Sequence, residues 1–257
     1  MLAEVVATST LTILAYAAVA VWCFLTALAG GVAGLVLGNI RLPALLLVAS
    51  SPAAGAGANI GVSAIAALTA GTTHIRAGRI DWRLVAWMTP PSVVGAAIGG
   101  LAAGALPGDA LLVVIGVTLL GFGIDLLRPR HAPTARRDRV DVRAAVIAGG
   151  LIGFLGGLVG LILGSLRMPA LLRFGEPPAK AVGTNLAVGV SVGIAGVAGH
   201  LPGGVDWGLL ALGGAASIPG ALLGARLTGR LDERQLLRVV GAILLVAGTA
   251  AIIQGLA

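Results

Sequence analysis

Two stretches of the chain decide the fold: Gly30–Leu46 reads GGVAGLVLGNIRLPALL, and Gly156–Leu172 reads GGLVGLILGSLRMPALL. They lie 126 residues apart, and 11 of their 17 aligned pairs are identical. The correspondence continues at the same offset through Asn59 and Asn185, and it runs on with one residue fewer after the next loop. Because a fixed period over so much of the chain is the mark of a repeat, we predict an internal duplication.

The composition is that of a membrane protein. Of the 257 residues, 58% are hydrophobic and 11% are charged, and the mean hydropathy is +1.03. A soluble domain carries about 25% charged residues, so this chain cannot cover a soluble globule with polar surface. The net charge of +7 comes from basic residues between apolar runs, which is typical of membrane topology and not of nucleic-acid binding. We expect an all-α, polytopic membrane protein.

The apolar runs divide the chain into a first membrane repeat (1–127), a cytoplasmic linker (128–143) and a second membrane repeat (144–257). A membrane helix needs about 20 apolar residues, which predicts about eight main spans. The predicted spans lie near 11–37, 56–73, 83–105, 110–127, 144–165, 182–199, 207–225 and 238–256. The short apolar pieces after each Arg-x-Pro, Pro43–Ala49 and Pro169–Phe174, are predicted to be broken or re-entrant helices.

Basic residues accumulate in cytoplasmic loops, which places the arginine-rich linker inside. If each repeat crosses the membrane an even number of times, nine of the 17 basic residues lie inside and eight outside. If each crosses an odd number of times, 14 lie inside, and Arg167, Arg173 and Lys180 lie outside. We therefore favour inverted repeats, an arrangement found in transporters with broken helices and a substrate site at the repeat interface.

The duplicated break is the first candidate site. Glycine permits unusual dihedral angles and proline removes a backbone donor, and broken backbone at membrane depth must be buried or line a cavity. The freed amides could face an anion. For the Gly-x3-Gly pairs alone, close helix packing is the competing interpretation. The candidate substrate-binding residues are Gly38, Asn39 and Pro43 in the first copy, and Gly164, Ser165 and Pro169 in the second.

Polar residues within predicted spans form the second candidate site, which contains Asn59, Thr184 and Asn185. Two asparagines at equivalent positions could hold a ligand, or they could bind helices to one another by hydrogen bonds. Symmetric repeats would place Asn59 opposite Asn185 across a pseudo-twofold axis, in one central cavity with the two breaks.

Arg41 and Arg167 are the third pair, two residues before each proline. Arginine suits bidentate recognition of oxyanions, but a position at a span end also allows the side chain to extend to the headgroups. We expect both arginines at the membrane surface, where they steer anions, with Arg41 at the inner mouth and Arg167 at the outer.

The sequence lacks the residue patterns of metal binding, ATP hydrolysis and nucleophilic catalysis. Cys23 is the single cysteine, so no cysteine cluster can hold a metal, and no P-loop motif occurs. No nucleophile and base pair stands out in the predicted spans. We therefore expect neither a catalytic residue nor a metal or other cofactor, and no enzyme.

The order of these motifs resembles the sulfite exporter TauE/SafE family. The matching residues are Gly34, Gly38, Pro43, Leu45 and Leu46, then Gly183 to Leu186, then Ile80-Asp81-Trp82 and Val205-Asp206-Trp207, then Gly95/Gly99 and Gly220/Gly224. The resemblance implies a multi-pass permease of the bacterial inner (plasma) membrane. It would move small organic or sulfur-containing anions, such as sulfite or sulfonates, by alternating access.

The chain departs from the family where the family is usually apolar, at both arginines of Arg-x-Pro, so its substrate can differ from sulfite. The expected partners are a small anionic substrate and the lipid bilayer; a coupling ion, either proton or sodium, and a homodimer stay open. The rival hypothesis is a membrane scaffold or assembly protein without a transported substrate.

Overall fold

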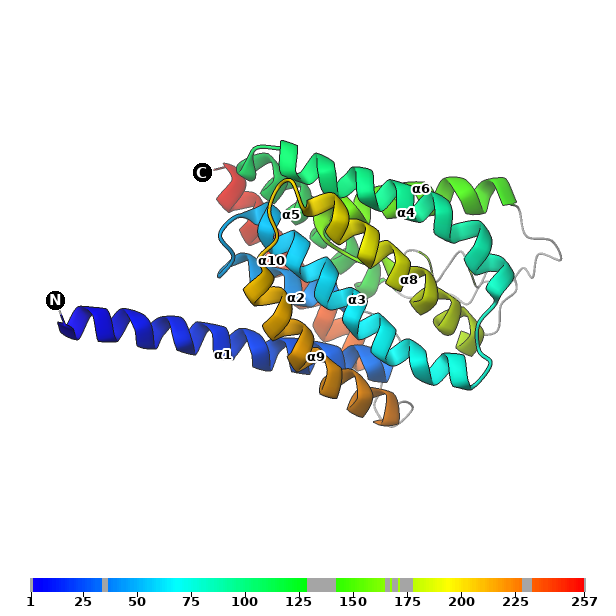
Figure 1. Ribbon diagram of the computed structural model, residues 1–257, viewed down its shortest axis with the longest axis horizontal. Coiled ribbons are helices and arrows are strands. Elements are labelled where there is room, and N and C mark those ends of the chain that lie inside the picture. The colour runs from blue at the N-terminus through cyan, green and yellow to red at the C-terminus, as the bar shows by residue number, and fades with distance from the viewer. Residues whose placement is uncertain are drawn as a thin grey trace.

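The computed structural model describes residues 2–33, 37–128, 142–164, 167, 171, 178–227 and 233–256. These residues form a bundle of nine helices and no strand, which confirms the all-α prediction (Figure 1). The helices are α1 (Leu2–Ala33), α2 (Gly38–Leu46), α3 (Pro52–Arg76), α4 (Trp82–Ala105), α5 (Gly108–Leu127), α6 (Val142–Val159), α8 (Pro178–His200), α9 (Trp207–Leu227) and α10 (Glu233–Leu256).

Six helices in the described part of the chain are long and apolar enough to cross a membrane. The prediction was about eight main spans. Helices α6 and α10 occupy the two remaining predicted positions, and α6 contains the shorter described apolar stretch Val146–Val159. The six candidate spans are Thr12–Gly31, Pro52–Arg76, Trp82–Ala105, Gly108–Asp125, Lys180–His200 and Trp207–Gly224.

The main helix contacts occur in matching pairs in the two copies. In the duplication, α6, α8, α9 and α10 are the copies of α1, α3, α4 and α5. Helix α1 packs against α9, and their counterparts α6 and α4 pack against each other. Helices α3 and α8 pack together, as do α5 and α10, so each of these pairs is made of a helix and its own copy.

Glycines allow the closest of these approaches. A Cβ atom on Gly99 of α4 would overlap the carbonyl oxygen of Phe154 in α6, and one on Gly224 of α9 would overlap that of Leu28 in α1. Gly99 and Gly224 are equivalent positions, as are residues 28 and 154. In these Gly-x3-Gly segments of α4 and α9, small residues let two helix backbones meet.

Helices α3 and α8 run in opposite directions. A Cβ atom on Gly57, near the start of α3, would touch His200 at the end of α8. A Cβ atom on Gly183, near the start of α8, would touch His74 near the end of α3. Figure 1 shows α1, α3 and α9 running one way along the bundle and α4, α6 and α8 the other. Each of these helices is therefore antiparallel to its own copy.

Many of the basic residues gather at one end of the bundle. Arg76, Arg79 and Arg83 lie around the turn from α3 to α4, and Lys180 at the start of α8 contacts Asp81 in that turn. The prediction that Lys180 lies across the membrane from the other three is wrong, because α8 is antiparallel to α3 and starts where α3 ends. Arg173, predicted to lie with Lys180, is outside the described residues.

Candidate functional site

The first Arg-x-Pro motif lies inside a short helix. Helix α2 contains both Arg41 and Pro43; it begins three residues before the arginine and ends at Leu46, three residues after the proline. The Arg41 side chain is only 1% exposed. The prediction that this guanidinium group lies at the membrane surface is therefore wrong. Helix α2 packs against α1 and α3, and Arg41 is buried there.

Arg41 belongs to a closed polar cluster. Its Nε donates to Asn59 Oδ1 at 3.0 Å, and its Nη2 donates to Ser63 Oγ at 2.6 Å. The Asn59 amide nitrogen donates to the carbonyl oxygens of Gly38 at 3.1 Å and of Gly160 at 2.9 Å. Because Gly160 belongs to the second repeat, this asparagine hydrogen-bonds across the two repeats. We call Arg41, Asn59 and Ser63 the first cluster.

Glycines at the two breaks make room for these side chains. A Cβ atom on Gly38 would collide with Ser63 Oγ, and one on Gly164 would collide with the Asn185 amide. Gly160 has a φ angle of 73° and lies against the backbone of Ala56. At these three positions a side chain would displace the polar groups or the helix backbone, so glycine is required by close approach.

The second copy holds an equivalent but incomplete cluster. Arg167 is 0% exposed, so the expectation of a surface position is wrong here too. Its Nη1 donates to Asn185 Oδ1 at 3.2 Å. Its Nε and Nη2 have no hydrogen-bond partner among the described residues. The position equivalent to Ser63 is Gly189, which supplies no hydroxyl group. We call Arg167 and Asn185 the second cluster.

The structure does not bring the two asparagines together. Gly196 of α8 lies beside Ile60 of α3, so Asn59 is level with a residue about 12 positions from Asn185, or about 18 Å along the helices. Ile60, Ala64 and Ile162 form a buried apolar cluster in this region. Each repeat therefore has its own Arg–Asn cluster, and the prediction that Asn59 faces Asn185 is wrong, because the register of α3 against α8 separates them.

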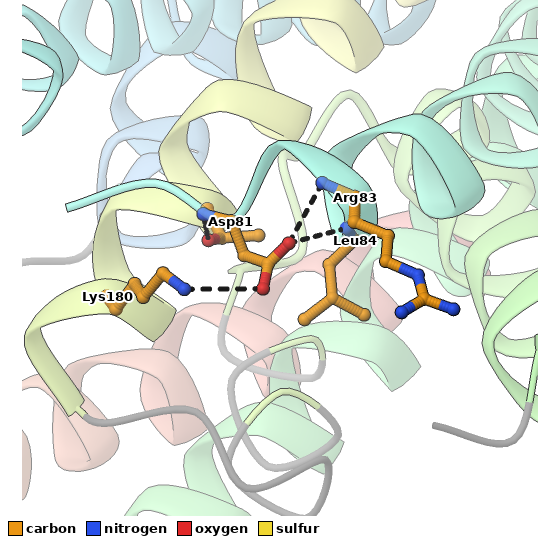
Figure 2. Close-up of polar contacts among 5 residues, drawn as sticks. Asp81, Arg83, Leu84 and Lys180 are labelled. Atoms are coloured by element: carbon orange, nitrogen blue, oxygen red, sulfur yellow. Dashed lines mark hydrogen bonds and ion pairs between the residues drawn. The ribbon is translucent and has the colours of Figure 1, made fainter. Parts of the chain in front are cut away.

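Thr184 has a structural partner in the other repeat. Its Oγ1 accepts from the backbone nitrogen of Asp81 at 2.9 Å. Figure 2 shows the Asp81 carboxylate accepting from the backbone nitrogens of Arg83 and Leu84, at the start of α4, and contacting Lys180 Nζ at 3.4 Å. Thr184 is next to Asn185 in the sequence but belongs to a different contact: it helps to fix the start of α8 to the start of α4.

The equivalent contact at the other end of the bundle is uncharged. Asp206 caps α9 by accepting from the nitrogen of Leu209 at 3.0 Å, as Asp81 caps α4. The counterparts of Lys180 and Thr184, however, are Ala54 and Ala58, and the Asp206 nitrogen donates to the Ala54 carbonyl oxygen at 3.3 Å. The two ends therefore differ: only the Asp81 end joins the repeats through an ion pair, within the described residues.

Of the remaining predicted site residues, some lie beside the first cluster and others lie outside the described residues. Asn39 lies half-buried on α2 beside the first cluster, and its side-chain oxygen accepts from the nitrogen of Ile40. Ser165 and Pro169 lie outside the described residues. Among the residues that the structure describes, no group of histidine, cysteine or carboxylate side chains could hold a metal ion.

Sequence reasoning missed Ser63 and the contact between Asp81 and Lys180. Ser63 could have been found, because it lies four residues after Asn59, on the same face of a helix. Alignment of the two copies would then have shown that the second copy has Gly189 in its place. The contact of Lys180 could not have been found without the relative direction of α3 and α8.

Comparison with known proteins gives a family and several relatives. The family model described as Sulfite exporter TauE/SafE matches residues 18–251. The probable membrane transporter protein YjnA of Bacillus subtilis (strain 168) is 30% identical, over 88% of this chain and 94% of that protein. The probable membrane transporter protein ORF9 of Sinorhizobium sp is 29% identical, over 79% and 77%. No solved structure matches the chain.

Proposed function

The chain belongs to the sulfite exporter TauE/SafE family, and from this premise we propose that it is a secondary transporter of small organic or sulfur-containing anions, such as sulfite or sulfonates. The names of the relatives support membrane transport. One observation carries the anion class: two arginines are fully buried in the bundle, and their side-chain partners in the described part of the chain are neutral groups.

A buried guanidinium group without a carboxylate is costly. Moving a charge out of water costs several kcal/mol even after the protein relaxes. Hydrogen bonds and an opposite charge must offset this cost. Amide and hydroxyl partners satisfy donors but do not neutralise the charge. Ionisable residues within membrane segments mark substrate pathways by default, and the fork of arginine matches the oxygens of carboxylates and other oxyanions. A small anion would supply the missing charge.

We propose alternating access by two inverted repeats. The antiparallel course of α3 and α8, and the symmetric packing of α1 with α9 and of α6 with α4, support this arrangement. The positive-inside rule then places the end of the bundle with Arg76, Arg79, Arg83 and Lys180 in the cytoplasm. Trp82 and Trp207 begin α4 and α9 at opposite ends and are 62% and 57% exposed, as expected for residues at the two membrane surfaces.

This topology predicts the sidedness of labelling in a Cys23→Ser background. Ala135→Cys and Asp232→Cys, both outside the described residues, should react with an impermeant thiol reagent only from the cytoplasmic side. Pro107→Cys and Pro202→Cys should react only from the opposite side, because they follow α4 and α8 at the other end. If the first two positions react from opposite faces, the inverted arrangement is wrong.

The ion pair of Lys180 with Asp81 is proposed to hold the cytoplasmic end closed. Partly exposed ion pairs contribute about 0.2–1 kcal/mol, so Lys180→Gln should raise the fraction of open protein by a factor of about 1.4 to 5. The readout is the labelling rate of Thr184→Cys, a buried position, from the cytoplasmic side. Thr184→Cys with Lys180 intact is the reference. An unchanged rate would show that this contact does not close the end.

The proposed function itself is tested by flux into proteoliposomes. Reconstituted protein should give saturable uptake of sulfite or of a short alkyl sulfonate, and none of dimethyl sulfone, a neutral compound of similar shape. Protein-free liposomes are the control for leak. If no small sulfur oxyanion or carboxylate moves faster than in those liposomes, the rival scaffold hypothesis replaces the transporter.

A further inference from the structure

We propose that the two arginines have different tasks: Arg167 binds the anion directly through its Nε and Nη2 edge, whereas Arg41 is a structural residue. This inference rests on the proposed transport of anions and goes beyond it by assigning the binding group. The duplication alone would give both arginines the same role. The difference arises from the partners that each repeat supplies.

The same edge of the guanidinium group is closed in one copy and open in the other. In Arg41, Nε donates to Asn59 Oδ1 and Nη2 donates to Ser63 Oγ and, at 3.4 Å, to the Asn59 carbonyl oxygen. In Arg167, Nη1 donates to Asn185 Oδ1. The Nε and Nη2 groups of Arg167 are buried and have no partner among the described residues.

A buried N–H group without an acceptor is rare and costly, and two on one planar edge form the fork that binds an oxyanion by two parallel bonds. Two differences between the copies leave this edge open: Asn185 Oδ1 accepts from Nη1 and not from Nε, and the counterpart of Ser63 is a glycine. Ser63 closes the edge of Arg41, but its counterpart Gly189 has no side chain. A Cβ atom on Gly189 would lie 3.1 Å from Ile162 Cγ2, so the position accepts a small side chain after a slight shift.

The open edge defines the ligand class. Two N–H groups side by side require two acceptor oxygens on one atom, as in a carboxylate, a sulfonate or sulfite, and the buried positive charge requires a negative ligand. A halide offers one acceptor centre, so it meets the two parallel N–H groups at bent angles, whereas two oxygens meet them in line. The site is therefore expected to prefer small oxyanions to chloride.

The test is a binding titration of the purified full-length protein with methanesulfonate, acetate and sulfite, with chloride and dimethyl sulfone as comparisons. Arg167→Lys keeps a positive charge but loses the fork, and it should weaken oxyanion binding at least about tenfold. Gly189→Ser should weaken it by a similar factor, because the new hydroxyl group can occupy Nη2 as Ser63 does in the first copy. Gly121→Ser is the matched control, because a Cβ atom on Gly121 meets nothing within 4 Å.

The outcomes separate the role of Arg167 from anion transport itself. Oxyanion binding by the wild type that is lost in Arg167→Lys and Gly189→Ser, but kept in Gly121→Ser, supports the assignment. Binding that persists unchanged in Arg167→Lys overturns the role of Arg167 and leaves the proposed anion transport intact. If the wild type binds none of the three oxyanions, the proposed function fails together with the inference. Thermal unfolding of each variant shows that it is folded.

Discussion

Replacing Arg167 by methionine should raise the stability of the anion-free protein, whereas replacing Arg41 by methionine should lower it. Arg167→Met removes a buried charge and two unsatisfied donors, each of which costs about 1–3 kcal/mol, and it leaves one acceptor, Asn185 Oδ1, without its donor. Arg41→Met removes no unsatisfied Nε or Nη2 donor and leaves both Asn59 Oδ1 and Ser63 Oγ without that guanidinium donor, at a cost of about 1–3 kcal/mol for each buried group. The two equivalent positions should therefore respond with opposite signs.

Thermal unfolding in detergent, in a buffer free of small oxyanions, measures this difference. One kcal/mol corresponds to about 2–4 °C in Tm for a chain of this size, so the two variants should differ by several degrees, with the wild type between them. A saturating oxyanion should stabilise the wild type and Arg41→Met but not Arg167→Met, because ligands stabilise only the protein that binds them. Equal destabilisation by both substitutions would contradict an open edge on Arg167.

Replacing Gly99 by leucine should strongly damage a helix contact. The side chain would be driven into the carbonyl oxygen of Phe154 and the nitrogen of Leu158 on α6. Backbone cannot move aside as a flexible side chain can, so α4 and α6 must separate. Overpacking usually costs about 1–3 kcal/mol, occasionally more, and we expect the upper end here.

The same change at Gly224 should be equally damaging, because its Cβ atom would meet the backbone of Leu28 in α1. Gly121→Leu is the matched control on α5, where nothing lies within 4 Å of the added Cβ atom. The yield of monodisperse protein and its Tm should fall for Gly99→Leu and Gly224→Leu and stay near the wild type for Gly121→Leu. A similar Tm for all three variants would contradict the close helix contacts.

The sequence was sufficient for the class of fold and for the duplication. Long apolar runs can satisfy their backbone groups in a membrane only as helices or closed barrels, and these runs are continuous rather than alternating. The matching Gly-x3-Gly segments then became equivalent contacts of α4 with α6 and of α9 with α1. Both conclusions depend on local pattern and on repetition, which a single sequence carries in full.

The site was predicted only in part. Asn59 and Asn185 are buried partners of Arg41 and Arg167, but the sequence placed the asparagines in one cavity and the arginines at the surface. Distance along a helix is readable from a sequence; the register between antiparallel α3 and α8 is a tertiary property. That register separates the two clusters and brings Lys180 to Asp81.

Burial of the arginines could not be inferred for a related reason. An arginine two residues before a proline suits a helix end at the headgroups, and it equally suits a short helix packed inside the bundle. The packing of α2 against α1 and α3 decides between them for Arg41. Nothing local to residues 41 or 167 distinguishes the copies, because the difference lies 22 residues downstream, at Ser63 and Gly189.

The central claim is that one buried arginine, Arg167, binds one small oxyanion in each chain. The most direct measurement is the stoichiometry of radiolabelled methanesulfonate bound to the purified full-length protein at saturation. We expect one anion for each chain in the wild type and none above background in Arg167→Gln. Two anions for each chain, or one that persists in Arg167→Gln, would contradict it.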